Sequence, residues 1–169
     1  RTFMSHGCEV IVVDDSQEGE GFACAASLGA TYIKKSVLDR RGLASSRNIG
    51  LSFAKGEFVV FVDDDDFYVG DDLQAMIANC EGNDFLCANY FHHSKDGLEP
   101  IDIKQFNLDL MLVCNMLPMG SFAIRRTAIR YGFDEEMRSH EDWDFLLRNC
   151  RWRLKNRLFF NRHRQDRKY

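Results

Sequence analysis

The sequence predicts an α/β domain in which helices cover both faces of a mixed, mainly parallel sheet. Two apolar runs, at 9–15 and 57–66, each end in consecutive carboxylates, and continuous apolar runs are typical of strands covered on both faces. Helix-like segments separate the predicted strands, and this alternation favours a sheet between two helical layers. A chain of 169 residues corresponds to one domain on the usual scale of about 100–200 residues.

Each element is predicted from a local signal. Apolar runs indicate strands, whereas segments that end at a glycine, as at Gly29 and Gly56, indicate helices. In chain order we expect a strand at 9–15, a helix at 19–28, a strand at 31–33, a helix at 43–55, a strand at 57–62, a helix at 69–80, a strand at 85–91, a loop or edge strand at 96–104, a helix at 106–113, a strand at 119–125, a helical turn at 127–131 and a helix at 139–150.

The helix at 139–150 has a recognisable apolar face. Side chains spaced i, i+3, i+4 and i+7 predict its buried stripe, namely Trp143, Leu146, Leu147 and Cys150. The same periodicity turns Glu141 and Asp144 away from that stripe and leaves Asp142 free to point elsewhere.

The charges are divided unevenly along the chain. The net charge is −4, yet the tail at 151–169 holds eight Lys and Arg residues against one acid, so residues 1–150 are strongly acidic. An acidic body excludes nucleic acid as a partner over most of the surface, because phosphate contacts need Lys and Arg. The basic tail has two open interpretations, a solvated end or a peripheral contact with an anionic membrane surface.

The cysteines and the apolar stretches indicate a cytoplasmic location. The six cysteines form no C-x-x-C pair and no secretory signal precedes them, which favours reduced thiols. A zinc site built from Cys80, Cys87, His92 and His93 fits none of the common ligand spacings, so we do not favour it. The longest uncharged stretch, at 110–124, is shorter than the ~20 residues that span a bilayer.

Carboxylates follow two of the predicted strands. Asp14 and Asp15 end the first run, and four consecutive aspartates at 63–66 end the second. Because ligands bind at the carboxyl ends of strands in open α/β sheets, we expect these groups to meet in one crevice. Asp-x-Asp at such an edge offers the hard oxygens that Mg²⁺ or Mn²⁺ prefers. The alternative is a set of solvated turn aspartates that cap the next helix, which we favour for Asp71 or Asp72.

Three other classes of acidic site lack a residue that they require. A haloacid-dehalogenase phosphatase needs Thr or Val where this chain has Phe67, and an EF-hand loop needs Gly where it has Tyr68. A response-regulator receiver does not carry four consecutive aspartates on its phospho-acceptor strand. All three are therefore excluded.

Four motifs in a fixed order give a more specific interpretation. Residues 9–16 are similar to an acidic strand-end motif, residues 42–50 to a Gly-x-x-x-x-Arg-Asn-x-Gly helix, and residues 54–66 to a strand leading into Asp-x-Asp. Residues 132–135 followed by 141–144 are similar to a final Glu-Asp motif. With these motifs the chain resembles the family 2 glycosyltransferases of the GT-A fold over nearly its whole length.

The resemblance implies a single GT-A domain, a Rossmann-like three-layer sandwich, over residues 1–169. Its nucleotide-sugar half would be 1–92 and its acceptor half, with the catalytic base, 93–150, followed by the tail at 151–169. The family begins with a further strand, and only eight residues precede Glu9. We therefore expect the first strand to be missing and the chain to be N-terminally incomplete.

The resemblance also implies roles for individual residues. Asp142 would be the catalytic base, and Glu141 would position Asp142 or the acceptor. Asp65 would hold Mn²⁺ or Mg²⁺ with support from Asp63 or Asp66, and His163 is a weaker candidate ligand. The nucleotide would be bound by Asp14, Asp15, Arg47, Asn48, Asp63 and Asp64. For Arg47 the alternative is an ion pair with one of the surplus carboxylates.

The implied reaction transfers a sugar from a nucleotide-diphosphate sugar to an acceptor hydroxyl with inversion at the anomeric carbon. The resemblance favours a UDP-sugar donor, a glycan or lipid-linked acceptor, and a role in cell-surface polysaccharide or glycan synthesis. The chain would act in the cytoplasm, with peripheral contact at the inner face of the membrane left open. The alternative function is a GT-A domain that binds nucleotide and metal without turnover.

Overall fold

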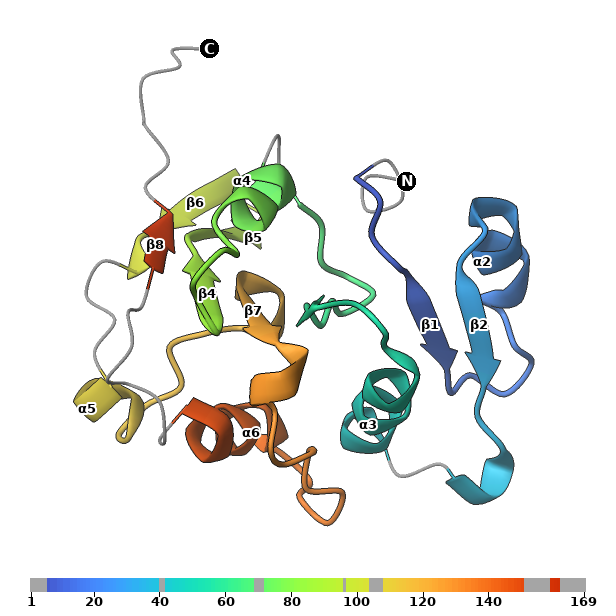
Figure 1. The fold of residues 1–169 in the computed structure, drawn as a ribbon. Coiled ribbons are helices and arrows are strands. Elements are labelled where there is room, and N and C mark those ends of the chain that lie inside the picture. The colour runs from blue at the N-terminus through green and yellow to red at the C-terminus, as the bar shows by residue number, and fades with distance from the viewer. Residues whose placement is uncertain are drawn as a thin grey trace.

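The computed structural model describes residues 6–39, 42–68, 72–95, 97–103, 108–150 and 159–161. Helices and strands alternate through the first half of the chain, and strands dominate its middle (Figure 1). The helices are α2 (Phe22–Leu28), α3 (Leu43–Phe53), α4 (Asp72–Ala78), α5 (Leu108–Met111) and α6 (Glu141–Cys150). The strands are β1 (Ile11–Asp14), β2 (Thr31–Lys34), β3 (Phe58–Val59), β4 (Phe85–Ala88), β5 (Tyr90–Ser94), β6 (Gly97–Ile101), β7 (Phe122–Arg125) and β8 (Phe159–Asn161). Single 3₁₀ turns lie at Val37–Asp39, Met119–Ser121 and Arg126–Ala128.

The strands form a parallel pair, β1–β2, a four-stranded sheet in the order β3-β7-β4-β8, and a hairpin, β5–β6. Strands β4 and β8 are parallel, whereas β7 runs antiparallel to both of its neighbours, and β5 is antiparallel to β6. The mixed sheet is confirmed. Most pairs among the described strands are antiparallel, because β7 runs opposite to β3 and β4, and β5 and β6 form a hairpin.

Helices cover both faces of the four-stranded sheet. On β7, Phe122 and Ile124 face one core cluster and Ala123 faces another, as the period-2 alternation of a strand requires. The first cluster includes Ala44 of α3 and Leu146 of α6, whereas Ala123 packs with α4. Figure 1 shows α4 and α6 on opposite sides of β4 and β7. The structure therefore has the three layers that the sequence predicted.

Helix α6 buries part of the predicted face, since Leu146 and Cys150 are buried as expected, but the buried stripe is shifted to include Phe145 and Asn149. Its buried residues are Phe145, Leu146, Asn149 and Cys150, whereas Trp143 and Leu147 are only half-buried. The reason is Phe145, whose ring stacks on Phe133 at 4.1 Å and meets Phe61 edge-on at 5.6 Å. Aromatic stacking of this kind outweighs the simple apolar spacing.

Asn149 is a polar residue in the core that the apolar pattern could not identify. Its Oδ1 accepts hydrogen bonds from the backbone N–H groups of Arg130 and Tyr131, at 2.8 and 3.1 Å. Its Nδ2 donates to the carbonyls of Tyr131 and Phe145. A buried amide with all these partners satisfied is stable, and it fixes the segment that precedes α6.

Several boundaries differ from the predictions. Only Phe58–Val59 of the 57–62 run forms ladder pairs, and the run at 85–91 divides into β4 and β5. The hairpin strand β6 occupies the segment predicted as loop or edge strand. Strand β8 pairs in parallel with β4, at a position where the sequence showed no clear strand. Among the described residues, no helix combines the length and apolar character needed to cross a bilayer.

Helix α3 lies between the β1–β2 pair and the four-stranded sheet (Figure 1). Gly50 brings it close to β1, since a Cβ at this position would lie 3.5 Å from Val13 Cγ2. On its other side Ala44 belongs to the main core cluster. This placement directs the first turns of α3 toward the ends of β1 and β3.

Candidate active site

A single arginine joins the acidic strand end to the start of α6. Arg47 Nη2 donates a hydrogen bond to Asp63 Oδ1 and Nη1 donates to Glu141 Oε1, both at 2.8 Å. The Arg47 side chain is only 9% exposed, and its guanidinium lies 5.5 Å from the centre of the Phe133 ring. The ion-pair alternative is therefore confirmed, and a direct contact between Arg47 and a nucleotide stays a prediction.

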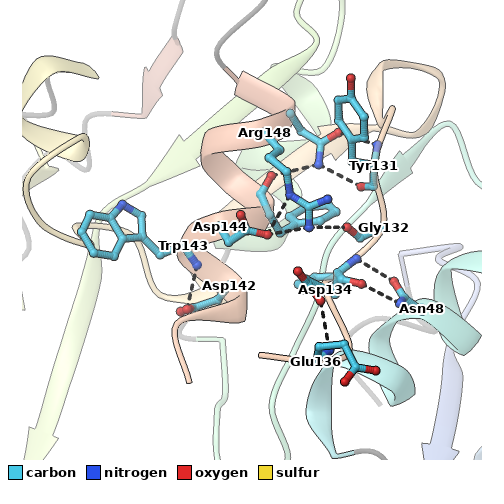
Figure 2. A network of polar contacts seen from close by, with 12 residues as sticks. Asn48, Tyr131, Gly132, Asp134, Glu136, Asp142, Trp143, Asp144 and Arg148 are labelled. Carbon is cyan, nitrogen blue, oxygen red and sulfur yellow. Dashed lines mark hydrogen bonds and ion pairs between the residues drawn. The ribbon is translucent and has the colours of Figure 1, made fainter. Parts of the chain in front are cut away.

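Asn48, the residue of α3 that follows Arg47, holds the segment that leads into α6 (Figure 2). Asn48 Oδ1 accepts a hydrogen bond from Phe133 N–H at 2.7 Å. Its Nδ2 donates to the Phe133 carbonyl and to Glu135 Oε1, both at 2.9 Å. Because both ends of this amide are engaged, the geometry gives Asn48 a positioning role, and its contact with the nucleotide stays a prediction.

Further polar contacts from α6 fix the same segment. Arg148 Nε donates to Asp144 Oδ2 at 2.7 Å, and Arg148 Nη2 donates to the Gly132 carbonyl at 3.0 Å. Asp134 Oδ1 accepts from Glu136 N–H within the turn (Figure 2). Arg148 had no predicted role, although its i, i+4 spacing from Asp144 is typical of an ion pair.

The carboxylate of Asp142 is oriented by two donors. Its Oδ1 accepts from Trp143 N–H at 2.7 Å, and its Oδ2 accepts from Asn115 Nδ2 at 2.9 Å. Asp142 is half-buried, next to Glu141, which is paired with Arg47. The two residues of the Glu-Asp motif therefore have different partners.

Asp14 holds the turn that follows β1. Its buried carboxylate accepts hydrogen bonds from the N–H groups of Ser16 and Gly21 and from the Tyr32 hydroxyl, at 2.8–2.9 Å. The Ser16 side chain, and then Tyr32 and Gly21, lower the pKa of Asp14 far below the usual carboxyl value, against the effect of burial. Asp14 is thus ionised and committed to its own turn. Asp15 is more exposed, with Lys35 Nζ at 4.0 Å.

The aspartate run after β3 concentrates negative charge. Burial, followed by the charges of Asp63 and Asp65, raises the pKa of Asp66. Asp64 and Asp65 are exposed, whereas Asp63 uses one oxygen on Arg47. The run is also close to the turn before β7, since a Cβ on Gly120 would lie 3.1 Å from Asp66 Oδ2.

The aspartates after β3 fit a divalent cation whose remaining ligands come from a substrate phosphate. Within the described part of the chain, no three His, Cys, Asp or Glu side chains form a ready-made metal cluster. Mg²⁺ is commonly held by one or two carboxylates and completed by substrate phosphates and water. Burial is the main cause of the raised pKa of Asp66, and the charges of Asp63 and Asp65 add to it; a divalent ion would offset those charges. His163 lies outside the described residues.

Comparison with known proteins defines the class of protein. A family model described as glycosyl transferase family 2 matches residues 5–149, and the chain belongs to that family. An uncharacterized glycosyltransferase of Haemophilus influenzae is 29% identical over 158 residues, covering 85% of this chain and 52% of that protein. The uncharacterized glycosyltransferase YwdF of Bacillus subtilis is 26% identical over 150 residues, covering 83% of this chain and 56% of YwdF.

The fold is shared with a solved structure. The crystal structure of glucosyl-3-phosphoglycerate synthase from Mycobacterium tuberculosis in complex with UDP matches with a TM-score of 0.58 and 17% identity. The match covers 94% of this chain and 61% of that chain, and it establishes the GT-A fold predicted from the sequence. The chain spans about half the length of the curated relatives that it matches.

We expect Gly132→Ala to destabilise the protein. A Cβ at this position would lie 2.7 Å from Asn48 Oδ1, and the Asn48 amide is held by three hydrogen bonds and cannot move freely. The expected loss in the free energy of unfolding, measured by urea denaturation, is about 1–3 kcal/mol, the usual cost of overpacking.

Gly50→Ala is the matched control for this prediction. Its added Cβ would make only an ordinary contact with Val13, and alanine is favoured over glycine inside a helix by ~0.5–1 kcal/mol. The control should therefore keep or gain stability. Wild-type stability in Gly132→Ala would show that Asn48 is not fixed as described.

Proposed function

We propose that this chain catalyses inverting transfer of a sugar from a UDP-sugar to an acceptor hydroxyl. The observation that carries the proposal is the Arg47 bridge, which places the aspartate run after β3 beside the Glu-Asp motif of α6. Membership of glycosyl transferase family 2 supports the reaction class, and the UDP complex of the structural neighbour supports the choice of donor.

The donor would bind at the ends of β1 and β3, in the half formed by residues 1–92. Asp65, with Asp63 or Asp66, would hold Mn²⁺ or Mg²⁺, and His163 is a further candidate ligand. When bound, such an ion offsets the negative charge that develops on the leaving diphosphate. We assign direct nucleotide contacts to Asp15 and Asp64, with Arg47, Asn48 and Asp14 shaping the site through the contacts described above.

The acceptor would bind against the half formed by residues 93–150. Asp142 accepts the proton of the acceptor hydroxyl while that oxygen attacks the anomeric carbon and the bond to UDP breaks. A single displacement from the face opposite to UDP inverts the anomeric configuration. Glu141, fixed by Arg47, positions the start of α6 relative to the donor.

The cellular setting is proposed from the same resemblance. The acceptor would be a glycan or a lipid-linked glycan in cell-surface polysaccharide synthesis, in the cytoplasm. The basic tail at 151–169 would add a peripheral contact with anionic lipid.

Metal-dependent UDP binding is the first consequence. Calorimetry should show UDP binding that strengthens when Mn²⁺ is added, because the ion links the aspartates to the diphosphate. Asp65→Ala should lose about tenfold in affinity with Mn²⁺ present, or ~1.4 kcal/mol. Glu81→Ala removes an exposed acid from the turn before β4 and should bind UDP like the wild type. Equal UDP affinity with and without Mn²⁺ would contradict the metal assignment.

The second consequence separates binding from chemistry. Asp142→Asn keeps the shape of the side chain but cannot take a proton near neutral pH, so turnover should fall by about 10²–10⁴-fold. UDP release from UDP-glucose, UDP-galactose and UDP-N-acetylglucosamine in the presence of Mn²⁺ measures turnover, and calorimetry should show unchanged UDP affinity.

Asp39→Asn is the control for this measurement, because Asp39 lies in the turn after β2 and contacts Ser36. Its turnover should match that of the wild type. Retained turnover in Asp142→Asn would remove this residue from the mechanism. Tight UDP binding by the wild type without turnover of any of the three donors would instead identify a binding domain.

A further inference from the structure

The segment from Met111, the last residue of α5, to the Met119–Ser121 turn is attached to the start of α6 at two points. Trp143 Nε1 donates to the Met111 carbonyl at 2.7 Å, and Asn115 Nδ2 donates to Asp142 Oδ2 at 2.9 Å. Met111 and Leu117 are fully buried, whereas Asn115, between them, is exposed. The apolar anchors and the indole hydrogen bond therefore hold the segment without help from the Asn115 amide.

A contact within the segment sets the orientation of that amide. Leu117 N–H lies 3.4 Å from Asn115 Oδ1, which directs the oxygen back into the segment and leaves the NH₂ group facing Asp142. The other carboxylate oxygen of Asp142 is taken by Trp143 N–H. The plane of the carboxylate is thus fixed from both sides.

From this geometry we propose that Asn115 is a positioning residue for the catalytic base. The proposal rests on the proposed role of Asp142. Each carboxylate oxygen can accept two hydrogen bonds, so the donors from Asn115 and Trp143 leave a free lone pair on each. By holding the carboxylate in one orientation, Asn115 keeps such a lone pair directed at the acceptor hydroxyl. It acts on the rate of transfer and not on donor binding.

Asn115→Asp is the sharpest variant, because the new side chain keeps the shape and the oxygen that faces Leu117 N–H. It replaces only the donor to Asp142 with a second carboxylate. A hydrogen bond to a charged group contributes enough that its loss should lower kcat for UDP release from the best UDP-sugar by about 10–100-fold. Asn115→Ala should lose a similar factor, whereas KM for the donor and the Tm should stay at the wild-type values.

Asn83→Ala is the matched control. Asn83 also hydrogen-bonds through Nδ2 to backbone carbonyls of its own turn, those of Asn79 and Glu81, on the far side of β4. We expect wild-type kcat for this variant.

A double-mutant cycle distinguishes this proposal from the proposed function on which it rests. If Asn115 acts through Asp142, Asn115→Asp should have no further effect on turnover in the Asp142→Asn background. Wild-type kcat in Asn115→Asp, beside an impaired Asp142→Asn, would overturn the positioning role alone. So would equal losses in both backgrounds, or a lower Tm that accounts for the loss of turnover. Wild-type turnover in Asp142→Asn would overturn the assignment of the base itself.

Discussion

Arg47 is nearly buried and donates to two carboxylates that lie 16 and 94 positions away from it in the sequence. A guanidinium removed from water is costly unless its donors are paired, and two carboxylates brought together repel each other unless a cation lies between them. The charge of Arg47 is therefore stabilised by Asp63 and Glu141, and their proximity is in turn stabilised by Arg47. Since Asp63 begins the aspartate run and Glu141 begins α6, this contact sets the distance between the proposed donor side and the proposed acceptor side of the site.

Helix α3 can serve this purpose because it is fixed on both sides. Gly50 allows it to lie against β1, and Ala44 packs in the core of the four-stranded sheet. One residue after the arginine, Asn48 holds the backbone of Phe133, whose ring stacks on Phe145 of α6. The hydrogen bond from Phe133 to Asn48 and the stacking of Phe133 on Phe145 thus both fix the position of α6 relative to α3. A substitution that moves α3 would be expected to displace Asp142, the proposed base, without contacting it.

The fold class could be predicted from the sequence, because each motif that indicates it is a short segment with its own local signal. The sequence did not predict which partners the residues of these motifs choose. The aspartate that ends β1, Asp14, accepts a hydrogen bond from Tyr32 of β2, and Asn115 contacts Asp142 from a segment with no recognisable motif. On α6, Leu146 and Cys150 are buried as predicted, but Phe145 is buried in place of Trp143 because its ring stacks on Phe133. Such choices depend on which distant segments meet, and local spacing does not contain that information.

The most direct test of the Arg47 bridge is a double-mutant cycle of Asp63→Asn and Glu141→Gln, with the free energy of unfolding measured by urea denaturation. If both carboxylates serve one arginine, either single variant leaves it one charged partner, whereas the double variant leaves a nearly buried cation with none. We therefore predict that the double variant loses more stability than the sum of the single losses, by about 1 kcal/mol or more, within the range seen for residues that share a network. Losses that add to within about 0.3 kcal/mol, as independent sites do, would contradict the bridge.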